Sequence, residues 1–136
     1  VDASGDLYIS GSTDGVSAAV LASAGCYQAT FGGTYDIFVA KFSSAGVRQW
    51  GTYYGDTSDD ETVNVSVDAS GNVYVAGYTD ATSGAVLTTA GAHQTTPGGS
   101  ADGLLVKFSS AGARIWATFY GDSGDDRKIC GPKLRL

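Results

Sequence analysis

Apolar and polar residues alternate over short stretches of this chain, and clusters of glycine, serine and aspartate separate these stretches. Residues 62–67, Thr-Val-Asn-Val-Ser-Val, alternate strictly, which predicts a half-buried strand. Residues 73–79, 103–108 and 113–120 are apolar or aromatic at most positions, which indicates strands covered on both faces. Asp-Ala-Ser-Gly-Asn at 68–72 and Ser-Ser-Ala-Gly at 109–112 predict tight turns. Residues 61–126 are therefore expected to form four short antiparallel strands.

This pattern occurs twice. A shift of 66 residues aligns the chain with itself without a gap, and 34 of the first 66 positions are then identical. Such a repeat is typical of a supersecondary unit that buries its apolar faces only against a neighbouring unit. Four-stranded antiparallel sheets packed face to face are the blades of a β-propeller. We therefore predict an all-β fold with two propeller blades per chain.

The repeat also predicts the division of the chain. Residues 1–60 are expected to be a first blade that lacks most of its innermost strand, and residues 61–126 a complete second blade. Residues 127–136 depart from the repeat and carry four of the eight Lys and Arg residues, so they are expected to be a divergent basic tail. Two blades do not close a ring, since propellers use about four to eight. The expected partners are further blades in cis or head-to-tail copies of the chain, and in the second case the tail could supply the missing strand.

Three motifs connect the chain to a known family. They are Asp-Ala-Ser-Gly-Asn-Val-Tyr-Val-Ala-Gly-Tyr-Thr at 68–79, Phe-Gly-Gly-Thr-Tyr-Asp-Ile-Phe-Val-Ala-Lys-Phe at 31–42 and Trp-Gly-Thr-Tyr-Tyr-Gly-Asp at 50–56. Together they resemble the SBBP-type bacterial β-propeller repeat, over about residues 1–126. The resemblance implies a propeller on a secreted or cell-surface protein, without assigned chemistry. The second copy departs from the pattern at Pro97 and Gly103, which predicts a looser entry into its third strand.

Net charge and composition argue against some classes of function. The net charge is −6, which argues against a nucleic-acid partner, and no run of about 18 apolar residues predicts a membrane span. Cys26 and Cys130 occupy non-equivalent repeat positions, so a repeated disulfide is not expected. Two free thiols, a bond between these two cysteines and a bond between chains all remain open.

The acidic residues gather at one end of the predicted blades. Strand alternation places the long connections 14–36 and 80–102 at the same end as the connections that leave the fourth strands, and 11 of the 14 Asp and Glu residues lie there. Carboxylates within five residues could ligate a hard cation such as Ca²⁺. The candidates are Asp56, Asp59, Asp60, Asp122, Asp125 and Asp126. The alternative is that these side chains cap backbone amides in turns.

Other recurring residues have structural explanations. Lys41 and Lys107 recur within apolar strands and are expected to pair with aspartates. The aromatic residues that recur in the fourth strands are expected to fill the core between blades, with a sugar-stacking platform as the alternative. They are Trp50, Trp116, Tyr53 and Phe119.

No catalytic motif emerges, since His93 is the only histidine and no nucleotide-binding glycine loop is present. We therefore expect no enzyme and no cofactor. The predicted function is a structural or interaction module of an extracellular or cell-surface propeller, serving scaffold, adhesion or assembly. The alternative is a carbohydrate- or cation-binding module that uses the acidic, long-loop end.

Overall fold

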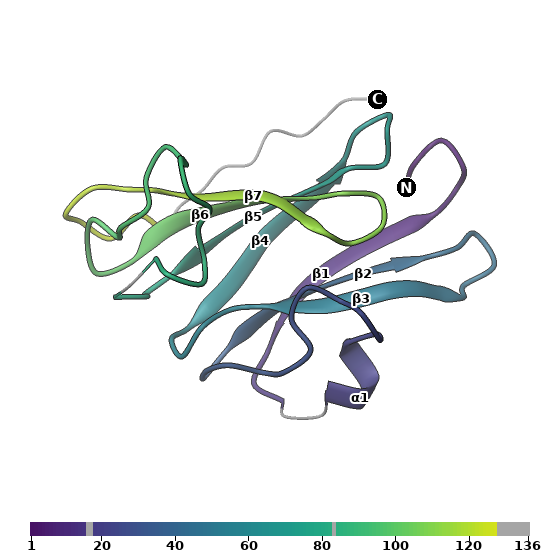
Figure 1. Ribbon diagram of the computed structural model, residues 1–136, viewed down its shortest axis with the longest axis horizontal. Helices are drawn as coiled ribbons and strands as arrows, with labels where there is room; N and C mark the ends of the chain where they lie inside the picture. The colour runs from purple at the N-terminus through teal and green to yellow at the C-terminus, as the bar shows by residue number, and fades with distance from the viewer. Residues whose placement is uncertain (16–17, 83, 128–136) are drawn as a thin grey trace.

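The computed structural model describes residues 1–15, 18–82 and 84–127, which form seven strands and one helical turn (Figure 1). The elements follow in the order β1 (Leu7–Thr13), α1 (Ala18–Leu21), β2 (Asp36–Phe42), β3 (Arg48–Tyr54), β4 (Asp60–Val67), β5 (Val73–Thr79), β6 (Asp102–Phe108) and β7 (Arg114–Tyr120). The predicted all-β class is confirmed. The short helix α1 was not predicted, because it lies in a connection whose glycine, serine and alanine content indicated only a loop.

The strands form two antiparallel sheets, each connected in sequence order. The first sheet has the order β1-β2-β3 and the second has the order β4-β5-β6-β7. The second sheet therefore has the four strands expected of a complete blade. The first sheet has the equivalents of the last three strands of such a blade. The edge of β1 that does not pair with β2 therefore has no neighbouring strand within the described sheet.

The sequence repeat is also a repeat of backbone geometry. Both sheets show a register shift at the same point, between Lys41 and Phe42 in β2 and between Lys107 and Phe108 in β6. The tight turns between β2 and β3 and between β6 and β7 each use a glycine with positive φ, 78° at Gly46 and 83° at Gly112. The turn residues were therefore read correctly from sequence, because only glycine adopts this conformation at little cost.

The two sheets pack against each other through the faces of their middle strands. Ile37, Val39 and Tyr54 of the first sheet join one buried cluster with Val73 and Phe108 of the second. β1 lies beside β4, and the Ser10 and Thr62 hydroxyl oxygens are 3.1 Å apart there. Buried and half-buried residues alternate along β5 and over most of β6, so only the face of the second sheet that meets the first sheet is fully covered. The prediction that these strands are covered on both faces is therefore wrong for the outer face, which carries apolar residues but is only partly buried.

The long connections fold back along the outermost strands. The Tyr53 amide of β3 donates to the Gln28 carbonyl at 3.1 Å, and the Phe119 amide of β7 donates to the Gln94 carbonyl at the same distance. Each connection thus hydrogen-bonds to an edge strand that would otherwise present free backbone groups. The prediction placed these segments only at one end of the blades, and it did not include this cover of the edges.

The short turns all lie at one end of the molecule, at the right of Figure 1, and the long connections begin at the opposite end. β3 ends at Tyr54 and β4 begins at Asp60, so residues 55–59 join the two sheets. Of the predicted basic tail, only Arg127 is among the described residues. The idea that this tail supplies a missing strand lies outside them.

Candidate functional site

Two acidic connections, residues 55–60 and 121–126, contain all six predicted cation ligands. In the first connection, the Asp60 carboxylate accepts a hydrogen bond from the Asp56 amide at 2.8 Å, and Asp56 accepts one from the Ser58 amide at 2.8 Å. In the second, Asp126 and Asp122 accept from the Asp122 and Gly124 amides, again at 2.8 Å. These four carboxylates therefore cap backbone amides within their own turns.

The remaining two candidates, Asp59 and Asp125, have contacts of a different kind. The Asp59 amide donates to the Asp80 carboxylate at 2.8 Å, and the Asp125 carboxylate lies 3.3 Å from the Arg127 guanidinium. Among residues 1–15, 18–82 and 84–127, no three His, Cys, Asp or Glu side chains are grouped as metal ligands. A cation at the six aspartates therefore stays a prediction, and the geometry seen here is that of turn capping.

The tertiary structure pairs two carboxylates, Asp36 and Asp60, that the sequence placed only at the same end of the blades. Asp36 is fully buried and accepts hydrogen bonds from the Gly32 amide at 2.9 Å, the Gly33 amide at 3.2 Å and the Gln28 side-chain amide at 3.1 Å. Asp60 lies beside the same Gly55 as Asp36. A Cβ at Gly55 would lie 2.6 Å from Asp36 Oδ1 and 2.9 Å from Asp60 Oδ2, so only glycine fits between the two carboxylates.

Asp60 is the member of this pair whose carboxylate has an oxygen without a hydrogen-bond partner. It is fully buried, and its Oδ1 has no hydrogen-bond partner. Burial raises the pKa of Asp60 to about 7, with smaller contributions in the same direction from the charges of Asp56 and Asp36, whereas hydrogen bonds from Thr79 and the Asp56 amide oppose the rise. Burial also raises the pKa of Asp36, against the hydrogen bonds of the two glycine amides. The pair can therefore hold a proton near neutral pH.

The two recurrent lysines have different partners. Lys41 Nζ forms an ion pair with Asp6 at 3.0 Å and lies 3.9 Å from Asp2, as the sequence predicted. Lys107 Nζ lies 4.9 Å from the centre of the Tyr74 ring. The second blade has Asn72 at the position of Asp6, and the Asn72 side chain donates to Asp68 at 2.8 Å. The predicted aspartate partner is thus confirmed for Lys41, while the contact seen for Lys107 is with an aromatic ring.

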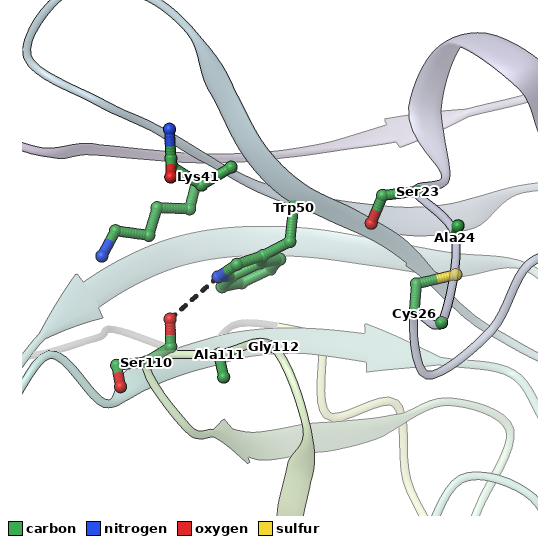
Figure 2. A pocket seen from close by; sticks show the side chains of 10 residues that line it. Ser23, Ala24, Cys26, Lys41, Trp50, Ser110, Ala111 and Gly112 are labelled. Carbon is green, nitrogen blue, oxygen red and sulfur yellow. Dashed lines mark hydrogen bonds between the residues drawn. The ribbon is translucent and has the colours of Figure 1, made fainter.

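The contact between the blades centres on Trp50. Its indole projects from β3 toward the turn between β6 and β7, and Nε1 donates to the Ser110 carbonyl at 2.9 Å (Figure 2). A Cβ at Gly112 would lie 2.8 Å from the indole ring, so the turn leaves room for Trp50 only with glycine there. Phe108 is the next ring, with its centroid 6.5 Å from that of Trp50. Trp50 and Phe119 join the core between the blades, as predicted. Tyr53 is buried against Phe31 outside that core and Trp116 is exposed, so the prediction is wrong for these two.

The outer faces of the two sheets expose the same residue positions that the inner contact buries. Trp116 is 38% exposed, whereas its equivalent Trp50 is 8% exposed. Leu7 and Ile9 are 46% and 37% exposed, whereas their equivalents Val73 and Val75 are at 0% and 2%. The chain therefore carries one completed contact between blades and two uncovered halves of the same kind of contact.

Two packed antiparallel sheets with a common 66-residue repeat define the chain as a pair of β-propeller blades. The family model of the SBBP β-propeller repeat matches residues 49–84, which include nearly all of β3 and the whole of β4 and β5. The predicted resemblance to the SBBP β-propeller repeat is thus confirmed in this segment. No curated protein matches the chain significantly. In the part of the chain that the structure describes, no helix has the length and apolar character of a membrane span.

Proposed function

We propose that this chain is a non-enzymatic structural module of an extracellular or cell-surface propeller, whose role is to assemble with further blades. The observation that carries the proposal is the pair of uncovered sheet faces. A large apolar side chain left in water forgoes about 1.5–3 kcal/mol of burial energy, so faces bearing Leu7, Ile9, Trp116 and Tyr120 favour coverage by another blade. The repeat supports this, because each blade presents on one face what its neighbour accepts on the other.

Adding blades covalently tests the assembly role. Copies of residues 61–126 are inserted after Asp126, so that each added unit continues the repeat and covers the Trp116 face of the unit before it. The melting temperature is expected to rise with each added unit, since interfaces between neighbours contribute much of the stability of repeat proteins. An unchanged melting temperature would show that the two-blade unit needs no neighbour and would refute the proposal.

The location of the module has its own test. Intact cells of the source organism are treated with a protease that does not enter them, and the chain is followed with an antibody. An extracellular module is expected to be degraded as fast as a known surface protein, whereas protection until the cells are lysed would contradict an outside location.

A second candidate function is cation binding at the acidic end, with or without a carbohydrate. One observation favours it: Asp60 is fully buried with an unpartnered Oδ1. If Ca²⁺ binds there, adding calcium is expected to raise the melting temperature, and a chelator to reverse the rise, because a ligand that binds only the folded state stabilises it. Equal melting temperatures with calcium and with chelator would remove this candidate, and a glycan array tests the carbohydrate.

The non-enzymatic part of the proposal is tested by activity screens. The wild-type chain is compared with Asp59→Ala and Asp125→Ala against hydrolase and lyase substrates. The proposal expects no turnover above that of buffer. A turnover that either substitution abolishes would overturn it.

A further inference from the structure

The outer face of the second sheet reproduces the group of side chains that the first sheet inserts into the blade contact. Trp116 and Tyr120 on β7 stand at the repeat positions of Trp50 and Tyr54 on β3. His93 stands at the position of Tyr27, and the ring centroids of His93 and Tyr120 are 5.8 Å apart at a tilt of 31°. The Tyr27 and Tyr54 rings are 5.6 Å apart at a tilt of 35°. This outer face is therefore already arranged as the inserting half of a contact.

The outer face of the first sheet has the matching receiving half. A hollow of about 450 Å³ opens there between β1 and the turn that follows β2, and its main lining residues are Leu7, Ile9, Phe42, Ser44 and Gly46. In the second sheet, the equivalents of Phe42, Ser44 and Gly46 are Phe108, Ser110 and Gly112, which are the residues that hold the Trp50 indole. No heavy atom lies within 4 Å of a Cβ placed on Gly46, whereas a Cβ on Gly112 meets Trp50. The hollow is therefore lined by the repeat equivalents of the residues that hold Trp50, but no indole lies in it.

Arg48 completes the receiving half. Its equivalent Arg114 donates to the Val86 carbonyl at 2.7 Å and holds its guanidinium 4.5 Å from the centre of the Tyr27 ring. Arg48 makes the same hydrogen bond, to the Val20 carbonyl. This hydrogen bond holds the Arg48 guanidinium in place on its own blade. A ring supplied by an incoming blade can stack against it, as the Tyr27 ring stacks against Arg114.

We propose that the hollow at Leu7, Ile9, Phe42, Ser44 and Gly46 binds Trp116 of a second copy of this chain, so that copies join head to tail. In this contact the Trp116 indole nitrogen of the second copy donates to the Ser44 carbonyl of the first copy, and Arg48 of the first copy covers His93 of the second. The occupant is another copy because both halves lie on the same chain and both repeat a contact that the chain already makes internally. The interface is heterologous, since different surfaces of the two copies meet. This inference rests on the proposed assembly role and names the partner.

The inserting half and the receiving half can be disabled separately. Trp116→Ala removes the incoming indole, and Leu7→Arg places a charge in the hollow. Both positions are exposed in the single chain, so the fold is expected to survive. Ile115→Ala and Val63→Arg are matched controls, since Ile115 neighbours Trp116 on β7 and Val63 is 47% exposed, nearly the same as Leu7.

Sedimentation velocity of the full chain over a concentration series measures the assembly. The wild-type chain and both controls are expected to form species larger than the 13.8 kDa single chain. Each disabling substitution is expected to raise the dissociation constant about 30-fold or more, as the loss of a central tryptophan or the entry of a buried charge does. Tyr120→Ala, at 67% exposure, provides a second test of the inserting half.

Mixing the two disabled variants gives the decisive result. The Trp116→Ala chain retains an intact hollow and the Leu7→Arg chain retains an intact Trp116, so the mixture is expected to form a complex of two chains and no larger species. A wild-type chain that remains single at all concentrations would overturn the inference, and so would a mixture that fails to associate. If the added-blade proteins still gain stability in that case, the assembly role stands and only the identity of the partner is wrong.

Discussion

Replacing Asp60 with asparagine tests the buried carboxyl pair between the two blades. Asp60 is fully buried with an unpartnered Oδ1, and burial raises its pKa from 3.8 to about 7. Between these two values the folded chain holds a proton that the unfolded chain has released. The free energy of unfolding must therefore fall as pH rises through this window.

The size of the effect follows from the two pKa values. A rise from 3.8 to about 7 corresponds to a loss of about 4 kcal/mol of stability between about pH 4 and pH 8. Asparagine keeps the acceptor for the Asp56 amide but does not ionise, so Asp60→Asn is expected to lack most of this loss. A shallower fall remains in the variant, because the pKa of Asp36 is raised as well.

Urea denaturation across this pH range, followed by circular dichroism at a fixed low protein concentration, measures the difference. The diagnostic quantity is the change with pH, because the buried amide of asparagine has a cost that does not depend on pH. Asp36→Asn serves as a second variant, and it is expected to move the titration of Asp60 to lower pH by removing a neighbouring charge. Parallel pH profiles for the wild-type chain and Asp60→Asn would refute the reasoning.

Three further substitutions test the packing of the blades by the same urea denaturation. Trp50→Ala is expected to cost about 3–5 kcal/mol, because a buried indole and its hydrogen bond to Ser110 are lost; a cost below about 1 kcal/mol would contradict the interface described here. Gly46 and Gly112 share a positive φ, so Gly46→Ala is expected to cost about 1–2 kcal/mol, and Gly112→Ala about 2 kcal/mol more than that, because its Cβ meets Trp50; equal costs would show that the turn moves away freely. Lys41→Met is expected to cost about 1 kcal/mol at low salt and less at high salt, because it removes the ion pair with Asp6; a cost that does not change with salt would assign the effect to packing.

The sequence by itself determined the strands, the turns and their repetition. These features depend on local patterns, since alternation sets which residues share a face of a strand and glycine sets where the chain turns. The four strands predicted for residues 61–126 appear as β4 to β7 with ends that differ by at most two residues. The same local patterns could not predict α1, because four residues give too short a signal.

The meeting of Asp36 and Asp60 was decided by tertiary structure. The two residues are far apart in sequence, and the prediction placed both at the acidic end of the blades but grouped Asp60 as a ligand only with Asp56 and Asp59. The Asp60 amide donates to the Tyr35 carbonyl at 2.8 Å, and this contact between β4 and the segment before β2 brings both carboxylates beside Gly55. Because pairing of this kind depends on which segments become neighbours, no spacing along the chain reveals it.

Tertiary structure also decided which of two equivalent residues is buried. Trp50 and Trp116 have the same strand position, as do Leu7 and Val73, yet in each pair one lies in the core and the other faces solvent. The sequence determines what each face can bind, since the two copies carry the same kinds of side chain. Whether a face is covered depends on the presence of a neighbouring sheet, because burial is a property of the packed pair and not of either sheet alone.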